Sequence, residues 1–548
     1  MKNKTELARE QLTNEEQMAR GSAWMTVGNI GSRLLGAVYI LPWYAWMGEH
    51  AKSANAMFNM GYNIYALFLM ISTAGIPSAI AKQTAHYNSL NEYGVSRKLF
   101  IRALQLMSVF GVIAAGAMWI LSPWLAHASG GGDELIPTMR SLSVAILVFP
   151  CMSVIRGYFQ GFKDMRPFAI SQIVEQVARV FYMLLATFII MKVAQGDYTT
   201  AVMQSTFAAF IGVLAGLAVL VVFLKKEQLR MDTLVEYSNN EVTVNTKELL
   251  VETIREAIPF IIVGSGITIF KLVDQFTFIK AMQSFTEYST DQLTDLFSIF
   301  SANPDKLTMV VIGLATSIAA TGLPLITTAK SQGDRKGLAK LISNNLQLIA
   351  FIMLPATFGM VVLAYPLNTL FYEPDVLGSR VLIQAAIAGL FIGLFMLTSS
   401  MLQGLYENKV AIQYLAIGLA IKLVLQYPFI RAFEVYGPLL TTMIAFAVVG
   451  YLNLRKLHEI SRFNFKFTAR RILLISLLTL IMFVVALFSR LLLGTFLDID
   501  SKSQSFIMVL LVGAIGGGLY GYLALKVRLA DQLLGSAADK IRRKLRLS

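Results

Sequence analysis

Long apolar stretches separated by short polar connections run along almost the whole chain. A helix of about 20 apolar residues spans a bilayer, because its backbone polar groups are all satisfied within the segment. The alternation of polar and apolar positions that marks a membrane barrel does not accompany these stretches. The pattern therefore predicts an all-α polytopic membrane protein. We count fourteen spans, which are residues 23–47, 56–81, 100–122, 137–159, 167–191, 200–224, 256–280, 307–329, 345–365, 381–403, 410–430, 437–454, 472–494 and 505–525.

The composition of the 548-residue chain agrees with this prediction. Apolar residues make up 56% of it and charged residues 15%, against roughly 45–50% and about 25% in soluble globular proteins. A large soluble enzyme is thereby excluded. The single cysteine, Cys151, and the four histidines give no basis for a disulfide framework, a metal site or an iron–sulfur cluster. We expect no metal and no cofactor.

The charged residues indicate how the helices are oriented. The formal net charge is +14, and cytoplasmic loops of membrane proteins carry an excess of Lys and Arg. With the N-terminus in the cytoplasm, basic residues such as Arg97 and Arg470 fall in inner loops, and acidic residues such as Asp133 and Asp498 fall in outer loops. We therefore expect both termini in the cytoplasm. The positive charge is an orientation signal, so no nucleic-acid partner is expected.

One polar interruption is longer than the others and follows the sixth span. It divides the first twelve spans into two sets of six. The first apolar stretch is too long for a cleavable signal peptide and lacks a small-residue cleavage site. The expected segments are a cytoplasmic N-terminal segment (1–22), a six-helix lobe (23–224), a cytoplasmic linker (225–255), a second six-helix lobe (256–454), a basic loop with two further helices (455–528) and a basic tail (529–548).

The two sets of spans share short motifs. Gly161 follows the fourth span within Gln-Gly-Phe, and Gly404 follows the tenth within Gln-Gly-Leu, 243 positions later. Arg179 in the fifth span has the same offset from Lys422 in the eleventh. An even number of helices keeps both sets in the same orientation. The sequence therefore predicts two six-helix bundles related by a pseudo-twofold axis along the membrane normal, an architecture typical of transporters.

A Gly-x-Pro step occurs in both sets and predicts a bend. Gly75 and Pro77 lie near the end of the second span, and Gly322 and Pro324 lie near the end of the eighth. Proline removes a backbone hydrogen bond and clashes with the preceding turn, so we expect helix hinges at these steps. No ATP-binding loop with the Gly-x4-Gly-Lys-Ser/Thr pattern occurs in the sequence. We therefore expect transport to use the membrane potential, an ion gradient or the gradient of the substrate.

A few charged residues fall deep inside the predicted spans. Each costs at least about 2.5 kcal/mol at the bilayer centre, so each must face a cavity or a partner. Glu175 lies four residues before Arg179, and Asp274 lies three residues after Lys271, so each acid can meet its basic neighbour on one helix face. Such pairs either line a cavity or lock neighbouring helices together. The four basic residues at this depth are Arg33, Arg179, Lys271 and Lys422.

The balance of these charges favours an anionic substrate. Arg33 and Lys422 have no acid within reach on their own helices, so we expect them to line an aqueous cavity. Guanidinium and ammonium groups both bind phosphate, whereas an exporter of cations would show unpaired carboxylates. Asn59 and Asn63 add hydrogen-bonding capacity to the cavity, although bridging between helices explains them equally well.

Three motifs resemble those of a known transporter group. Arg33-Leu-Leu-Gly36, Gly75-Ile-Pro77 and Arg156-Gly-Tyr-Phe-Gln-Gly161 are similar to motifs of the polysaccharide-transporter branch of the multidrug/oligosaccharidyl-lipid/polysaccharide superfamily. The fourteen spans, the long linker and the two extra C-terminal helices make the chain most similar to MurJ-like lipid II flippases of the YtgP type. The resemblance covers residues 20–528.

This resemblance implies a substrate and a mechanism. The substrate is a cell-wall precursor linked to undecaprenyl pyrophosphate, moved from the inner to the outer leaflet of a bacterial plasma membrane by alternating access. The family's cavity arginine on the first helix corresponds to Arg33, but the second helix carries Asn59 and Asn63 in place of further arginines. The last two helices correspond to a groove for the lipid tail. Besides the lipid-linked substrate and bilayer lipids, the implied partners are proteins of cell-wall synthesis or division.

Other functions remain open from the sequence. A flippase for teichoic acid or capsular polysaccharide units has the same lipid pyrophosphate and a different head group. A drug or cation antiporter of the same superfamily, of the MATE type, is disfavoured by the basic cavity. A scaffold for cell-wall synthases is disfavoured by the short inner loops. None of these readings includes covalent chemistry, so we expect that the protein is not an enzyme.

Overall fold

Helices form the regular secondary structure in the part of the chain that the structure describes. The computed structural model describes residues 31–32, 35–36, 38–73, 76–162, 164–239, 255 and 257–534. Several predictions lie outside these residues and are not tested by the fold. They concern Arg33, Gly75, the N-terminal segment 1–22, much of the linker 225–255 and most of the tail 529–548.

The chain divides into two compact units. The first comprises Met1–Tyr39, Ile64–Ala126 and Asp133–Ile261, and the second comprises Ile40–Asn63, His127–Gly132 and Ile262–Ser548. The boundary between Asn63 and Ile64 falls within one continuous helix, α3 (Ala51–Thr73). The first half of α3 therefore belongs to the second unit and its second half to the first.

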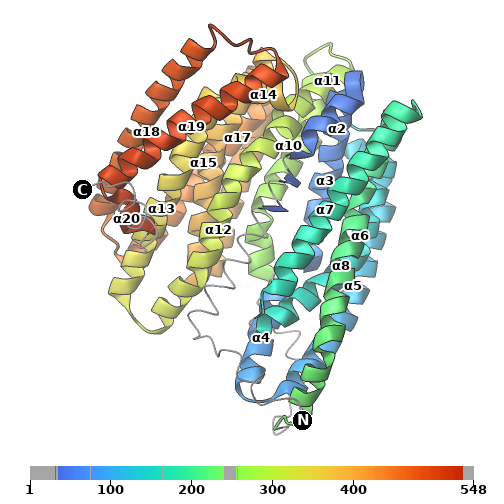
Figure 1. Cartoon of the computed structure of the whole chain (residues 1–548), viewed down its shortest axis with the longest axis vertical. Helices are drawn as coiled ribbons and strands as arrows, with labels where there is room; N and C mark the ends of the chain where they lie inside the picture. Colours follow the sequence, from blue (N-terminus) through green and yellow to red (C-terminus); the bar gives the residue numbers. More distant parts are fainter. Residues whose placement is uncertain are drawn as a thin grey trace. The chain divides into compact units, whose positions relative to one another are not determined.

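Long helices packed along one another form the first unit (Figure 1). Helix α7 packs along α8, while α6 contacts both α8 and α4. Asp197 caps the start of α8 by accepting a hydrogen bond from the backbone of Thr200. The helices are α4 (Ile76–Ser89), α5 (Tyr93–Ala128), α6 (Leu135–Gly161), α7 (Arg166–Phe188) with a π-helical turn at Ile189–Val193, and α8 (Tyr198–Glu236).

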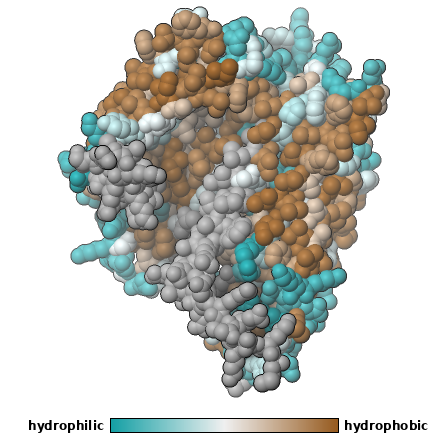
Figure 2. All heavy atoms as spheres, in the orientation of Figure 1, coloured by the Kyte–Doolittle hydropathy of each residue, from teal (hydrophilic) through white to brown (hydrophobic). Residues whose placement is uncertain are grey.

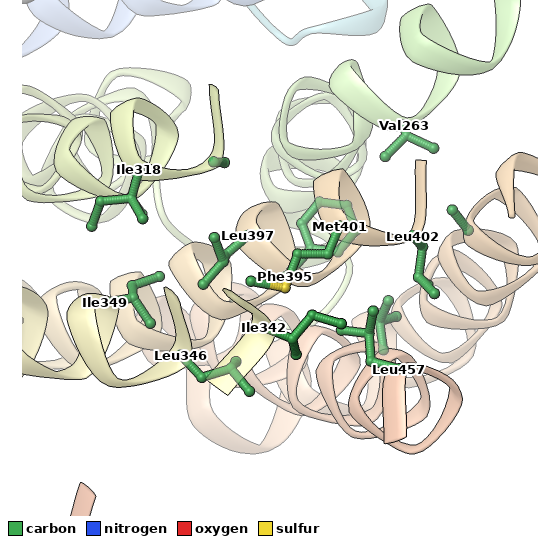
Figure 3. Close-up of a cluster of buried hydrophobic side chains, with 14 of the residues drawn as sticks. Val263, Ile318, Ile342, Leu346, Ile349, Phe395, Leu397, Met401, Leu402 and Leu457 are labelled. Carbon is green, nitrogen blue, oxygen red and sulfur yellow. The ribbon is translucent and has the colours of Figure 1, made fainter. Parts of the chain in front are cut away.

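The second unit contains more helices. They are α2 (Ile40–Met47), α10 (Gly266–Gln283), α11 (Thr290–Phe297), α12 (Asn303–Ser331), α13 (Arg335–Val362), α14 (Ala364–Phe371), α15 (Val376–Gly404), α16 (Asn408–Phe433), α17 (Gly437–Ser461), α18 (Phe465–Leu493), α19 (Lys502–Lys526) and α20 (Leu529–Leu534). Helix α12 packs on α13 and α15, α16 packs on α17, and α18 packs on α13 and α19. Side chains from α12, α13, α15 and α17, including Ile318, Ile342, Leu397 and Leu457, form its apolar core (Figure 3).

Many of these helices are long and apolar enough to cross a membrane. Among the described residues, nine helical runs meet this criterion, and a bent pair, Ala257–Gly264 with Gly266–Gln283, meets it together. One of the nine runs, Asn408–Ser461, contains both α16 and α17. The backbone turns between them at Glu434, whose φ is +47°, and the two helices pack against each other, so this run comprises two helices. The predicted all-α multi-pass protein is confirmed, whereas the count of fourteen helices stays a prediction.

Apolar side chains also lie on the outer surface of the helices. Figure 2 shows them gathered over α18 and α19. Leu473, Leu480 and Phe488 on α18 and Leu510 on α19 are each more than half exposed. A soluble protein rarely exposes so many large apolar side chains on one face. This surface is therefore suited to contact with lipid chains.

The ends of α6 and α15 have the same hydrogen-bonding pattern. The N–H group of Asp164 donates to the carbonyl oxygen of Phe159 at 3.1 Å, and the N–H group of Glu407 donates to that of Leu402 at 2.9 Å. Each donor and each acceptor in the second unit follows its counterpart by 243 positions. The predicted repeat thus has a counterpart in local structure.

Candidate functional site

One acidic residue lies between two arginines in the first unit. Arg156 of α6 donates from Nη2 to Oε2 of Glu175 at 2.9 Å, and Arg179 donates from Nη2 to Oε1 at 2.6 Å. Arg156 also donates from Nε to Oγ of Ser171 at 3.0 Å. One carboxylate therefore serves two guanidinium groups through charge-assisted hydrogen bonds. This arginine–glutamate cluster (Arg156, Glu175 and Arg179) carries a surplus positive charge.

Close packing of α8 against α7 determines which part of the cluster is accessible. A Cβ atom on Gly212 would lie 2.7 Å from the carbonyl oxygen of Glu175, so only glycine allows this approach. The side chains of Arg156 and Glu175 are 8% and 9% exposed, whereas that of Arg179 is 19% exposed. Arg179 is thus the member of the cluster that a ligand reaches most easily.

The cluster contains a residue that the sequence pattern did not identify. The predicted contact between Glu175 and Arg179 is present, but Arg156 is the second partner of the acid. Arg156 lies near the end of the predicted fourth span, where a long basic side chain can often reach the membrane surface. The sequence signal that could have identified Arg156 was its position inside the predicted span 137–159.

A second set of charges lies in the second unit. Lys422 of α16 is fully buried and donates to Oδ1 of Asp274 on α10 at 2.7 Å. Lys271, also on α10, forms an ion pair with Asp305 at the start of α12. The expected contact between Lys271 and Asp274 is thus replaced by two ion pairs between helices, because Asp274 faces α16. Asp305 precedes the predicted span 307–329 and was not identified as an intramembrane acid.

The two ion pairs border a small cavity whose lining is mostly apolar. Its volume is about 60 Å³, which leaves room for water. Lys271, Asp274 and Asp305 contribute its charged lining, and Phe270 and Ile312 are among its apolar walls. The charges of the two lysines and two aspartates cancel. The side chain of Lys271 is 25% exposed, whereas that of Lys422 is 0% exposed. Lys271 is therefore the more accessible of the two lysines.

Asn59 and Asn63 on α3 form bridges between helices. Nδ2 of Asn63 donates to Oδ1 of Asn59 at 3.1 Å and to Oε1 of Gln275 on α10 at 3.0 Å. The hydroxyl of Ser301 donates to the same Asn59 oxygen at 3.2 Å. Both asparagines are buried. The bridging role that the sequence left open is therefore present in this structure.

The predicted hinges lie in different surroundings. The described part of α3 ends at Thr73 and that of α4 begins at Ile76, so the hinge predicted at Gly75 lies outside the described residues and stays a prediction. Gly322 and Pro324 instead lie within α12, which is continuous from Asn303 to Ser331.

In the described part of the chain, no group of three or more His, Cys, Asp or Glu side chains is placed to hold a metal ion.

The chain is similar to known bacterial membrane proteins. Residues 18–330 match the family model described as "Polysaccharide biosynthesis protein". The lipid II flippase MurJ of Bacillus subtilis is 33% identical over 535 residues, covering 95% of this chain and 97% of that protein. The uncharacterized membrane protein YabM of the same organism is 25% identical over 519 residues, covering 94% of each chain.

A solved structure shows the same fold. The structure of the lipid II flippase MurJ in an inward closed conformation superposes with a TM-score of 0.64 at 15% identity, covering 92% of this chain and 99% of that one. Because the identity is low, this likeness concerns the fold. It extends over nearly the whole length of both chains.

Proposed function

The chain belongs to the MurJ lipid II flippase family, within the polysaccharide biosynthesis proteins, and we propose that it moves lipid II from the inner to the outer leaflet for peptidoglycan synthesis. The observation that carries this proposal is the 33% identity to a lipid II flippase over 95% of the chain. As a member of this family the protein is a transporter and not an enzyme. Lipid II is a cell-wall precursor attached to a polyprenyl pyrophosphate, and its charge is negative.

The accessible cations suit such a substrate. We propose that Arg179 and Lys271 contact the pyrophosphate, since each keeps part of its side chain exposed. Arginine binds phosphate through two parallel hydrogen bonds, and lysine binds it as a point charge. Arg33 joins this set by its resemblance to the family's cavity arginine. The substrate-binding role predicted for Lys422 and Asp274 stays a prediction; in this structure they bind each other.

The lipid tail requires an apolar path, and the helices after the second lobe offer one. A groove of about 410 Å³ lies between α13, α18 and α19. Gly513 and Gly517 line it, and a Cβ atom at either position would meet nothing within 4 Å. We propose that the polyprenyl chain lies in this groove or in adjacent lipid while the head group passes through the aqueous cavity that alternating access requires.

We further propose the architecture that alternating access requires. Fourteen helices form two six-helix bundles, residues 23–224 and 256–454, with two further helices in 455–528. The matched ends of α6 and α15 support this repeat. Both termini lie on the cytoplasmic side of a bacterial plasma membrane, which the excess of basic residues in the inner loops supports. The membrane potential or an ion gradient drives the cycle, and proteins of cell-wall synthesis are candidate partners.

A leaflet-protection assay tests the function. The purified protein is reconstituted in liposomes with fluorescent lipid II, and dithionite added outside quenches the label that becomes exposed. A teichoic acid precursor on the same lipid is the comparator. We expect rapid loss of protection for lipid II and not for the comparator. Equal flipping of both would indicate a flippase of broader specificity, and flipping of neither under an applied membrane potential would contradict the proposal.

A further inference from the structure

Four oxygen atoms surround one buried ammonium group in the second unit. Nζ of Lys422 lies 2.7 Å from Oδ1 of Asp274, 2.8 Å from Oγ1 of Thr442, 3.2 Å from the carbonyl oxygen of Pro438 and 3.3 Å from Oγ1 of Thr441. The lysine side chain is 0% exposed. Three of the four oxygens are uncharged. The surroundings of this group therefore go beyond a salt bridge with one carboxylate.

The two threonine hydroxyls are placed to accept from the ammonium group. Thr441 donates its proton to Oε1 of Gln426 at 2.9 Å or to the carbonyl oxygen of Pro438 at 2.8 Å, and Thr442 donates to the same carbonyl oxygen at 2.9 Å. Their lone pairs remain for Nζ. A carboxylate, a carbonyl and two hydroxyls thus converge on one positive charge, and such oxygen ligands are those that hard metal cations take in proteins.

We propose that these four oxygens form a site for a monovalent cation, which the ammonium group of Lys422 fills as a tethered ion. An ammonium group is a compact point charge, so it satisfies the same ligands as a sodium or potassium ion. Asp274 keeps the positive partner that a buried carboxylate needs. The protein then requires no free ion at this place, and removal of the lysine head group creates a site for one.

The adjacent cavity makes exchange for an ion feasible. Asp274 and Thr442, two of the four oxygen donors, also line the cavity of about 60 Å³ that extends to Lys271 and Asp305. An ion that enters from this cavity meets the carboxylate directly. Water in the cavity and in the volume vacated by a truncated lysine completes the coordination of the ion. The proposal concerns ion binding and does not depend on which lipid is transported.

The experiment compares thermal unfolding of the full-length protein in detergent with NaCl, KCl or choline chloride at equal ionic strength, since choline is too large for the site. We expect the wild-type protein to unfold at one temperature in all three salts. Lys422→Ala should unfold at a temperature a few degrees higher in NaCl or KCl than in choline chloride, because an ion that binds the folded state stabilises it. The double variant Lys422→Ala/Asp274→Asn lacks the carboxylate and should lose this rise.

A matched control uses Lys271, the lysine of the other ion pair beside the cavity. Lys271→Ala also removes a cation from a carboxylate, but the side chains of Lys271 and its partner Asp305 are 25% and 20% exposed, so water can solvate the remaining carboxylate and no ion-specific rise is expected. The proposal is overturned if Lys422→Ala unfolds at the same temperature in all three salts, or if the double variant shows an equal rise. If Lys422→Ala proves unstable, its purified yield in each salt replaces the unfolding temperature. Recovery of the double variant alone would then overturn the proposal, and recovery of Lys422→Ala in NaCl or KCl only would support it.

Discussion

Gly404 of α15 lies against Thr327 of α12, whose hydroxyl donates a hydrogen bond of 3.1 Å to the carbonyl oxygen of Gly404. The corresponding residues of the first unit, Gly161 of α6 and Thr84 of α4, precede them by 243 positions and are also in close contact. A Cβ atom on Gly161 would come within 2.6 Å of Cγ2 of Thr84. Each unit thus packs the end of one helix on a threonine of another by means of a glycine.

This contact predicts an unequal response to alanine at the two positions. Gly161→Ala should destabilise the protein by about 1–3 kcal/mol, the usual cost of overpacking. Gly404→Ala should cost less, since the nearest atom, Cδ1 of Leu323 at 3.1 Å, belongs to a flexible side chain. Thermal unfolding measures both. Gly116→Ala is the control, because its Cβ atom would meet nothing within 4 Å; an equal loss in all three variants would contradict the prediction.

The two arginines that share Glu175 should differ in what their loss affects. Arg156→Ala should lower stability by about 1–3 kcal/mol, because Ser171 and one buried carboxylate oxygen lose their donor. Arg179→Ala should also lower stability, because Oε1 of Glu175 loses its donor. It should in addition slow flipping by roughly 10–100-fold, which corresponds to one charge-assisted contact of about 1.5–3 kcal/mol with the substrate. Flipping rates in liposomes and unfolding temperatures separate the two effects.

A conservative variant makes this prediction sharper. Arg179→Lys keeps the positive charge and loses the two parallel donors, so we expect a flipping rate between those of the wild-type protein and Arg179→Ala. Normal flipping by Arg179→Ala would exclude a contact between this side chain and the substrate.

The membrane spans are the part of this fold that sequence patterns predict well. Bilayer thickness fixes the length of a spanning helix, and the absence of water fixes its apolar composition. The predicted spans 200–224 and 381–403 accordingly lie within α8 and α15. Helix ends extend further than predicted, because polar residues that continue a helix beyond the bilayer carry no hydropathy signal.

The partners of the intramembrane charges are harder to predict. The Glu175–Arg179 pair follows from spacing along one helix, whereas Lys422 finds Asp274 148 positions away on another helix. No periodicity within a single helix reports such a contact. Arg156 and Asp305 were missed because they lie at the ends of apolar stretches, where composition alone does not distinguish a buried charge from an exposed one.

The start of α8 should respond to pH through Asp197. The Thr199 hydroxyl and the backbone N–H groups of the first turn donate to this carboxylate and hold its pKa below the ordinary range. Its stabilising contribution is therefore complete above the ordinary pKa of about 3.9 and is lost as the pH falls through the lower value in the folded state. Asp197→Ala should cost about 0.5–2 kcal/mol at neutral pH, and the difference from the wild-type protein should shrink in acid.

An uncharged cap distinguishes charge from hydrogen bonding at this position. Asp197→Asn keeps an acceptor for the first turn of the helix, so its stability relative to Asp197→Ala should not depend on pH. Unfolding temperatures measured from neutral to acidic pH give the comparison. A cost of Asp197→Ala that stays constant throughout would contradict the assignment of the lowered pKa to this cap.

The first half of α3 offers a test of alternating access. Nδ2 of Asn55 donates to Oδ1 of Asn303 at 2.7 Å, and both residues belong to the second unit. Because α3 continues into the first unit at Ile64, relative motion of the units must either bend α3 or release this contact. In a Cys151→Ser background, which removes the single native cysteine, the variant Asn55→Cys/Asn303→Cys should stop flipping when oxidised and recover when reduced.

A second disulfide within the same unit provides the control. Nδ2 of Asn453 on α17 donates to Oγ1 of Thr398 on α15 at 3.0 Å, and both helices belong to the part of the second unit that contains its apolar core. Oxidised Thr398→Cys/Asn453→Cys should therefore flip normally, because the packed core moves as one body. If oxidised Asn55→Cys/Asn303→Cys also flips normally, with its disulfide verified by mass spectrometry, the first half of α3 stays on the second unit throughout the cycle. Helix α3 would then have to bend near Ile64, where the unit boundary lies.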